Sequence, residues 1–205
     1  DPQNRVGKLV LPEGRQLDDV RDVKTNAVTD GIFSLVSRAT CVNLDSDRHC
    51  VSVDDLRKAA GSVAPSALSV PDWAINAVTA MGNDHRRLEG LIAPGTWNID
   101  PSESAEDILS TLIGTSATQY AQGGLLDTAK LMNMSPYQIL TVGSLVQRES
   151  KPDDFAKVAR VIYNRLHEHR TLEFDSTVNY PLDRIEVATT DADRAQHTPW
   201  NTYVR

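Results

Sequence analysis

The sequence is poor in the features that mark several classes of protein. Aromatic residues make up 5% of its 205 residues, and there are only two cysteines. No apolar run approaches the roughly eighteen residues of a membrane span, and the first residues lack the pattern of a secretion signal. No long run of Lys and Arg is present, and the formal net charge is -7. We therefore expect no nucleic-acid partner.

What is present is typical of a globular protein. Hydrophobic residues make up 40% of the chain and charged residues 24%, which is enough for one sizeable core or two small ones. The chain starts at Asp1, without a Met, and stops at Arg205 directly after Tyr203 and Val204. We expect both ends to lie inside a longer protein.

Short strand and helix patterns alternate along the chain, which predicts an α+β fold. The apolar run at residues 8–11 is typical of a strand, whereas Leu17, Val20 and Val23 have the spacing of a helix. Further helical patterns follow in three places, at residues 32–36, 53–60 and 102–113. Ser52 is placed to cap the second of these helices, and the opening Ser104-Ala105-Glu106-Asp107 suits a capped third helix.

Residues 61–72 predict a boundary between two parts of the chain. The composition there shifts to Ser, Ala, Pro and Val, and Pro65 and Pro71 prevent a regular helix. We expect a small module over residues 1–70 and a larger domain over residues 71–205.

The cysteines Cys41 and Cys50 bracket the polar segment 42–49. A disulfide between them would close this segment as a loop and imply an oxidising compartment. The alternatives are two unpaired thiols, or half of a metal site with His49. The sequence lacks the further Cys and His residues that a structural zinc site needs.

The clearest helix begins after Ser135 and is expected to reach about Ser150. Pro136 stands at its first position, and Gln138 follows Ser135 by three residues, as in a capping box. A second helix is expected after Pro152, with one apolar stripe made by Phe155, Val158, Ala159, Ile162 and Leu166. Residues 171–174 then alternate like a strand.

Glu149 shares the apolar face of the first of these helices. At about 100° per residue it falls on the same arc as Val142 and Val146. A carboxyl among apolar side chains loses water, which favours its protonated form, and glycoside cleavage needs such an acid. The alternative is that Glu149 lies in a frayed last turn, in solvent or paired with Lys151 or Arg165.

Three motifs follow one another between residues 143 and 180. They read Gly-Ser-Leu-Val-Gln-Arg-Glu-Ser, Val-Ala-Arg-Val-Ile-Tyr-Asn-Arg-Leu and Leu-Glu-Phe-Asp-Ser-Thr-Val-Asn-Tyr. This order resembles the signature of the endolytic murein transglycosylases, the MltG or YceG-like family. Residues 89–97 and 198–203 are similar to two further family segments, so the resemblance covers about residues 85–205. The Leu-Pro-Glu-Gly segment at residues 11–14 resembles the family's LysM-like subdomain.

The resemblance implies a catalytic role for Glu149, which matches the second acid of the family's Val-Glu-Lys-Glu stretch. Gln147 replaces the first acid, on the opposite face of the predicted helix. The implied reaction is lytic. Glu149 protonates the oxygen between N-acetylmuramic acid and N-acetylglucosamine, and the muramic 6-hydroxyl attacks to give a 1,6-anhydro end. One acid that later acts as a base suffices, and no metal or cofactor is required.

The resemblance also implies a partner and a place. The substrate would be nascent peptidoglycan glycan strands, whose cleavage helps to end their elongation, and penicillin-binding-protein synthases are expected partners. The protein would work at the extracytoplasmic face of a bacterial plasma membrane. An anchoring helix would precede Asp1, and part of the cleft would follow Arg205.

Several other residues are expected at the site, each with a structural alternative. Asn164 and Arg165 either hold sugar or carboxylate groups or brace their helix. Asp175 and Thr177 either orient Glu149 or a sugar hydroxyl, or form a turn. If Asp175 is instead a nucleophile, the enzyme is a hydrolase.

The aromatic residues near the end of the chain leave a similar choice. Tyr180, Trp200 and Tyr203 either stack on sugar rings or fill the core, and we expect Asn201 and Tyr203 in a cleft. Glu89 is a candidate sugar contact, although Leu91 and Trp97 are among four departures from the family's segment there.

Two other functions stay open at this point. One is a lysozyme-like muramidase, which would leave reducing ends. The other is a glycan-binding scaffold without catalysis. Three of the five histidines lack metal-ligand companions at useful spacing and are expected in solvent, namely His167, His169 and His197.

Overall fold

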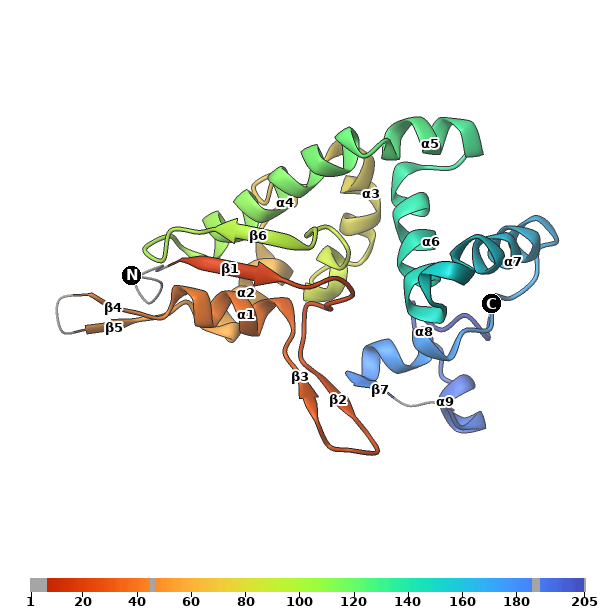
Figure 1. Ribbon diagram of the computed structural model, residues 1–205, viewed down its shortest axis with the longest axis horizontal. Helices are drawn as coiled ribbons and strands as arrows, with labels where there is room; N and C mark the ends of the chain where they lie inside the picture. The colour runs from red at the N-terminus through yellow and green to blue at the C-terminus, as the bar shows by residue number, and fades with distance from the viewer. Residues whose placement is uncertain (1–6, 45–46, 186–188, 205) are drawn as a thin grey trace. The chain divides into compact units, whose positions relative to one another are not determined.

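The structure is a computed structural model that describes residues 7–44, 47–185 and 189–204 (Figure 1). It divides into two compact units, and each is described here by itself. The first comprises Asp1–Asp18 and Asp30–Leu140, and the second comprises Asp19–Thr29 and Thr141–Arg205. Helices and small sheets occur in both units, so the predicted α+β class is confirmed.

In the ranges that the structure describes, the first unit combines small two-stranded sheets with several helices. Strand β1 (Lys8–Leu11) pairs antiparallel with β6 (Gly95–Asn98), and Leu9 lies opposite Trp97. The helices are α1 (Ile32–Thr40), α2 (Val53–Ser62), α3 (Asp72–Ala80), α4 (Ala105–Gln122) and α5 (Leu125–Met132). A 3-10 helix, η2 (His85–Leu88), precedes β6.

One apolar core holds this first unit together. In β1, Leu9 and Leu11 are buried whereas Lys8 and Val10 are exposed, which is the alternation expected of a half-buried strand. The helices contribute fully buried side chains to the same cluster, including Phe33, Leu56, Leu109, Leu112 and Ile113. The first unit therefore has a hydrophobic core of its own.

The predicted helix starts in this unit are confirmed by their hydrogen bonds. The Ser52 hydroxyl accepts from the backbone N–H of Asp55 at 3.0 Å. The Ser104 hydroxyl accepts in the same way from Asp107 at 3.2 Å. Each bond satisfies a backbone donor that the first turn would otherwise leave unpaired.

The predicted disulfide is present, between Cys41 and Cys50. It closes the segment that contains β4 (Val42–Leu44) and β5 (Asp47–His49), which pair antiparallel. Both thiols are used in the bond, so the alternatives of unpaired thiols or of a half metal site are wrong.

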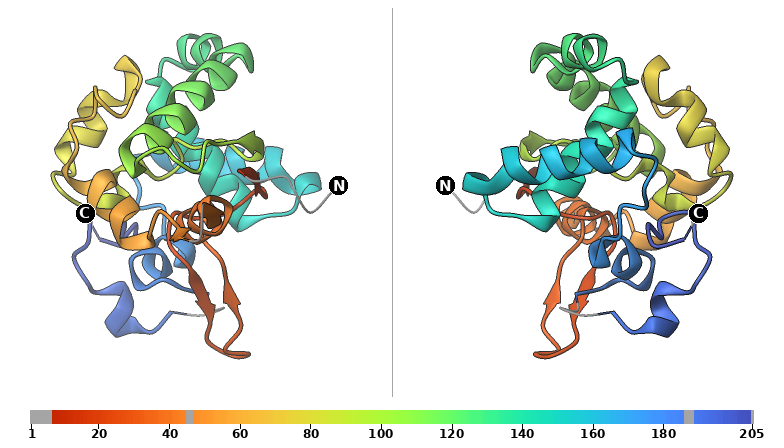
Figure 2. Two further views of the ribbon diagram at one scale, coloured as in Figure 1. Left: turned by 90° about the vertical axis from the view of Figure 1, so that its left-hand side faces the viewer. Right: turned by 90° about the vertical axis from the view of Figure 1, so that its right-hand side faces the viewer.

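The helix expected at residues 17–23 is wrong. Val20–Asp22 is strand β2, which forms an antiparallel hairpin with β3 (Val28–Thr29), seen side by side in Figure 2. The Asp22 carboxylate accepts from the backbone N–H of Lys24 at 2.9 Å and of Thr25 at 2.8 Å. These bonds and the left-handed conformation of Asn26 (φ 58°) turn the chain back.

The second unit is mainly helical. Helix α6 (Pro136–Glu149) brings the chain into it, followed by η3 (Pro152–Asp154), α7 (Phe155–His167), α8 (Asp175–Asn179), η4 (Tyr180–Leu182) and α9 (Asp191–Arg194). Strand β7 (Arg184–Ile185) pairs parallel with β2 and completes a three-stranded sheet of order β3-β2-β7. Both long helices therefore form where the sequence predicts them.

The strand expected at residues 171–174 is wrong. Glu173 has a left-handed backbone (φ 56°), which interrupts an extended chain. Its N–H donates to the carbonyl of Thr202 at 3.0 Å, and the N–H of Phe174 donates to the Thr202 hydroxyl at 2.9 Å. The segment is a loop that leads directly into α8.

The division into a 1–70 module and a 71–205 domain stays a prediction, as does the LysM-like character of the module. The first compact unit extends across residue 70, because β1 pairs with β6. Within the ranges that the structure covers, no helix has the length and apolar character needed to cross a membrane.

Candidate active site

The capping box predicted for α6 is present. The N–H of Ser135 donates to the Gln138 side-chain oxygen at 2.8 Å, and the N–H of Gln138 donates to the Ser135 hydroxyl at 3.1 Å. Val142 and Val146 are buried, each with 7% of its surface exposed. One turn later Glu149 is the last residue of the helix.

The expectation that Glu149 is desolvated among apolar side chains is wrong for this structure. The residue is exposed, because α6 ends there and no further turn covers it. Neither Lys151 nor Arg165 pairs with it. Across the part of the chain that the structure covers, its carboxylate has no hydrogen-bond or ion-pair partner. The result is an accessible carboxyl group whose oxygens are available to a ligand.

The two polar residues of the α7 motif have different surroundings. The Arg165 guanidinium donates to the carbonyl of Leu172 and lies 5.9 Å from the centre of the Phe174 ring. Arg165 therefore braces the loop between α7 and α8. Asn164 is exposed, and its carboxamide makes no hydrogen bond within the described ranges. Of the two, Asn164 is the side chain available to a ligand.

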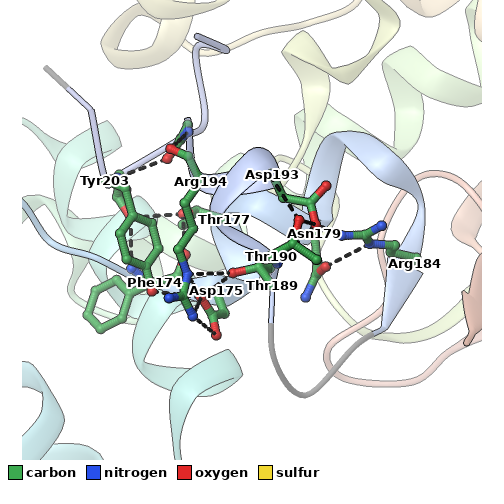
Figure 3. Close-up of polar contacts among 12 residues, drawn as sticks. Phe174, Asp175, Thr177, Asn179, Arg184, Thr189, Thr190, Asp193, Arg194 and Tyr203 are labelled. Atoms are coloured by element: carbon green, nitrogen blue, oxygen red, sulfur yellow. Dashed lines mark hydrogen bonds and ion pairs between the residues drawn. The ribbon is translucent and has the colours of Figure 1, made fainter. Parts of the chain in front are cut away.

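Asp175, the first residue of α8, is the centre of a polar network (Figure 3). Its Oδ1 accepts from the Thr189 hydroxyl at 2.6 Å and from the Tyr203 hydroxyl at 2.6 Å. The Arg194 guanidinium contacts both carboxylate oxygens, with Nη2 at 3.2 Å from Oδ1 and 3.3 Å from Oδ2. Asp175 thus joins three segments that are far apart in the sequence.

This network changes the acidity of its members. Burial alone would raise the pKa of Asp175, but the hydrogen bonds from Thr189 and Tyr203 and the charge of Arg194 outweigh it and lower the pKa. Burial, together with the hydrogen bond to Asp175, raises the pKa of Tyr203 to about 12. Near neutral pH the carboxylate is therefore ionised and the phenol keeps its proton.

Thr177 and Asn201 also make hydrogen bonds to backbone groups of the second unit. The Thr177 hydroxyl donates to the carbonyl of Phe174 at 2.7 Å and lies 2.8 Å from the Thr202 hydroxyl. The Asn201 amide donates to the carbonyls of Arg194 at 2.9 Å and Gln196 at 2.5 Å. Its carbonyl accepts from the N–H of Tyr203 at 2.9 Å. Asn201 is buried inside this loop, and its place in a cleft with Tyr203 stays a prediction.

Tyr180 and Trp200 form an aromatic pair in the second unit. Their ring centres are 5.6 Å apart, and the rings meet edge to face at 61°. Both residues are partly exposed. Part of the pair's surface is therefore available for contact with a ligand.

Glu89 belongs to the first unit, where it fixes the backbone. Its carboxylate accepts from the N–H of Leu17 at 3.1 Å and of Gly90 at 3.3 Å. The Tyr120 hydroxyl donates to the carbonyl of Gly90 at 2.9 Å. Burial raises the pKa of Tyr120 to about 12, and the negative charge of Glu89 adds to the effect. The structure thus gives Glu89 a role in holding its own loop.

Thr189 and Arg194 were not predicted as partners of Asp175. A second cluster was not predicted either, in which Arg184 donates to Asn179 at 3.0 Å and to Asp193 at 2.8 Å. A capping box links Thr190 and Asp193 at the start of α9. The hydrogen bond from the Thr190 hydroxyl and then the interaction with Arg184 lower the pKa of Asp193 to about 2.

The sequence does contain a signal for α9, because Thr190 precedes an acid by three residues. No local signal exists for the contacts of Arg194. Among the residues that the structure covers, no group of three or more His, Cys, Asp or Glu side chains is arranged to hold a metal ion. His167, His169 and His197 are exposed, as expected.

Comparisons with known proteins agree with the motifs in the second unit. The endolytic murein transglycosylase of Bacillus subtilis (strain 168) is 32% identical over 135 residues, which are 65% of this chain and 37% of that protein. The endolytic murein transglycosylase of Streptococcus pneumoniae serotype 2 (strain D39) is 24% identical over 187 residues, which are 90% of this chain and 31% of that protein. This chain thus spans about a third of the length of these relatives.

A solved structure agrees with the fold. The crystal structure of a yceG-like protein from Listeria monocytogenes is similar with a TM-score of 0.71 and 26% sequence identity. The similarity covers 97% of this chain and 59% of that one. The model of the YceG-like family matches residues 2–205. The chain therefore belongs to the YceG-like family.

Proposed function

We propose that this chain is part of a bacterial lytic transglycosylase that cleaves peptidoglycan glycan strands, with Glu149 as the catalytic acid. The observation that carries the proposal is the exposed, unpartnered carboxyl of Glu149 at the end of a capped helix. Membership of the YceG-like family, and relatives named endolytic murein transglycosylases, support it. The reaction class is that of a carbon–oxygen lyase.

The proposed reaction needs one carboxyl group in two states. Protonated Glu149 gives its proton to the oxygen that links C1 of N-acetylmuramic acid to N-acetylglucosamine, and the C1–O bond breaks. The 6-hydroxyl of the same muramic sugar then forms a bond to C1. The Glu149 carboxylate takes the proton of that hydroxyl, so the acid is restored and the product ends in a 1,6-anhydro sugar.

The substrate itself supplies the desolvation that the free protein lacks. In this structure Glu149 is exposed to water. Sugar rings that cover it remove this water, which disfavours a buried charge and favours the protonated acid of the first step. Asn164, whose carboxamide has both donors and an acceptor, is the second side chain proposed to contact the glycan.

The surroundings of Asp175 favour a lyase over a hydrolase with a carboxylate nucleophile. Hydrogen-bond donors and a cation that hold a carboxylate stabilise its negative charge and make it a weaker nucleophile toward the anomeric carbon. The Oδ1 of Asp175 already accepts from Thr189 and Tyr203, and Arg194 contacts both oxygens. The attacking group is therefore proposed to come from the substrate.

The biological setting is part of the same proposal. The names of the relatives support a role in the cell envelope. Cleavage of nascent strands would end their elongation, at the extracytoplasmic face of the plasma membrane and beside penicillin-binding-protein synthases. We propose that an amino-terminal membrane helix and a LysM-like module hold the protein at this membrane.

The deciding experiment compares Glu149→Gln with Glu168→Gln in the complete gene product. Both glutamates are exposed and stand at the C-terminal ends of helices in the second unit. Purified glycan strands are digested and their ends identified by mass spectrometry. We expect anhydro ends from the unmodified protein and from Glu168→Gln, and a rate about a thousandfold lower from Glu149→Gln.

Each other outcome points to a different function. Reducing ends would show a muramidase. Binding of strands without cleavage by the unmodified protein would show a scaffold. Equal rates for the Glu149→Gln and Glu168→Gln variants would remove Glu149 from the mechanism.

A further inference from the structure

The end of the described chain is held by polar contacts and not by a core. Between residues 189 and 204 the buried side chains are those of Thr189 and Asn201, both polar, and the range has no buried apolar side chain. Without apolar burial, the conformation of a loop depends on its hydrogen bonds and ion pairs. The Asp175 network is therefore what sets the shape of this segment.

Arg194 has the largest number of roles in that network (Figure 3). Its guanidinium contacts the Asp175 carboxylate at 3.2 Å and donates from Nε to the Thr189 hydroxyl at 2.9 Å. It also lies 5.0 Å from the centre of the Tyr203 ring, within the range of a cation–π contact. Its backbone carbonyl accepts from the amide of Asn201 at 2.9 Å.

The segment that Arg194 holds carries an aromatic side chain. Trp200 lies between Thr198 and Asn201, and the N–H of Asn201 donates back to the carbonyl of Thr198 at 3.1 Å. The Trp200 ring packs edge to face on Tyr180 and is partly exposed. Aromatic faces of this kind suit the apolar face of a pyranose ring. Loss of the segment's shape would therefore displace Trp200.

We propose that Arg194 is a positioning residue, which fixes residues 198–203 through Asp175 and Tyr203 so that Trp200 and Tyr180 present a surface for a sugar ring of the glycan strand. The inference rests on the proposed function for the identity of the ligand. It gives Asp175 an indirect role in place of the direct sugar contact that the sequence suggested, because Asp175 acts by holding Thr189, Arg194 and Tyr203.

The test measures glycan binding and cleavage separately in the complete gene product. Binding is followed by the fluorescence of Trp200 on addition of purified, uncrosslinked glycan strands, in proteins that also carry Glu149→Gln. The Trp200→Phe variant separates the signal of Trp200 from that of the protein's other tryptophans, which include Trp73 and Trp97. Cleavage is measured as KM and kcat in proteins that keep Glu149. The variants are Arg194→Gln and, as a control, Arg170→Gln, which breaks an exposed ion pair with Glu168.

For Arg194→Gln we expect weaker glycan binding, a higher KM and a kcat/KM about a hundredfold lower, the size of effect produced by misplaced binding groups. The larger part of the loss should be in KM. Arg194→Lys keeps the positive charge but lacks the planar guanidinium fork, so it should recover only part of the lost kcat/KM. Arg170→Gln should bind and cleave like the unmodified protein.

The proposal is overturned if Arg194→Gln binds and cleaves as Arg170→Gln does. If Arg194→Gln fails to fold, Thr189→Val, which removes one hydroxyl of the network at nearly constant volume, takes its place. An unchanged glycan affinity in Thr189→Val would then overturn the proposal. If the unmodified protein does not cleave glycan but Arg194→Gln weakens its binding, the lyase function fails while the positioning role stands.

Discussion

The two units of this molecule differ in what holds them together. In the described residues the contiguous apolar core lies wholly in the first unit. The described part of the second unit buries a few scattered apolar side chains: Val20, Val142, Val146, Ile162, Phe174 and Val178. The second unit relies instead on networks around Asp175 and Asp193. Burial of apolar area is the larger stabilising term, so the unit that carries Glu149 is expected to be the less stable one.

The same contrast holds for two aspartates. Asp18 in the first unit is 5% exposed and binds Arg57 at 2.7 Å and His85 at 2.5 Å. Asp175 in the second unit has 27% of its side chain exposed and mixes neutral hydroxyl donors with Arg194. A buried ionic cluster stabilises its unit, whereas a partly exposed one mainly sets the geometry of a loop.

Charge also divides unevenly between the units. By sequence, the first contains 10 basic and 16 acidic residues and the second 11 and 12, so their net charges are -6 and -1. Most of the acidic excess thus lies in the first unit.

The largest expected effect is the loss of stability caused by removing a buried phenylalanine, which should differ between the two units. Phe33 in the first unit is fully buried and Phe174 in the second is 8% exposed. We expect Phe33→Ala to reduce the free energy of unfolding by about 4 kcal/mol and Phe174→Ala by about 2 kcal/mol, because fewer apolar neighbours are lost. Urea unfolding with hydrogen exchange resolved by segment measures both. Equal losses would refute the contrast between the units.

A smaller loss of stability is expected in the first unit when the pH is lowered. Burial alone would raise the pKa of Asp18, but hydrogen bonds and charges from His85 and Arg57 lower it from 3.8 to about 2. Because the folded pKa is the lower one, the carboxylate stabilises the fold above pH 4, and this contribution is lost as the pH falls to about 2. It amounts to about 2 kcal/mol for the first unit.

Unfolding of the first unit followed between pH 5 and pH 2 measures this term. The Asp18→Asn variant should be less stable at pH 5 and should lose this part of the pH dependence. A variant with the same acid sensitivity as the unmodified protein would show that other carboxyl groups are responsible.

The smallest expected effect is local. Thr189→Val removes the hydroxyl that donates to Asp175 at 2.6 Å and accepts from Arg194 at 2.9 Å. We expect a loss of about 1 kcal/mol, seen as faster hydrogen exchange in residues 189–204 and in α8. The amides of α4 should exchange at their original rates. Faster exchange in α4 as well would mean that the network supports more than its own loop.

Features governed by neighbours in the sequence could be predicted from it. Ser52, Ser104 and Ser135 cap their helices, because a cap depends on residues two or three positions away. The disulfide joins cysteines nine positions apart. The ordered motifs around Glu149 were sufficient to indicate the family.

Features governed by distant partners could not be predicted. Val20 and Val23 have the spacing of a helix, yet β2 forms a strand because β3 and β7 supply its hydrogen bonds. Residues 171–174 alternate like a strand, but they meet Thr202 in place of a neighbouring strand. Periodicity reports which side chains are apolar, and it does not report which backbone groups will pair.

The sequence by itself determined the family of this protein, its capped helices and Glu149 as the candidate acid, since each is written in a short stretch of chain. Only the tertiary structure decided that Glu149 is exposed and that Asp175 is committed to Thr189, Arg194 and Tyr203. The reason is physical. Exposure and hydrogen bonding depend on which segments meet in space, and Asp175 and Tyr203 are separated by 28 positions in the sequence.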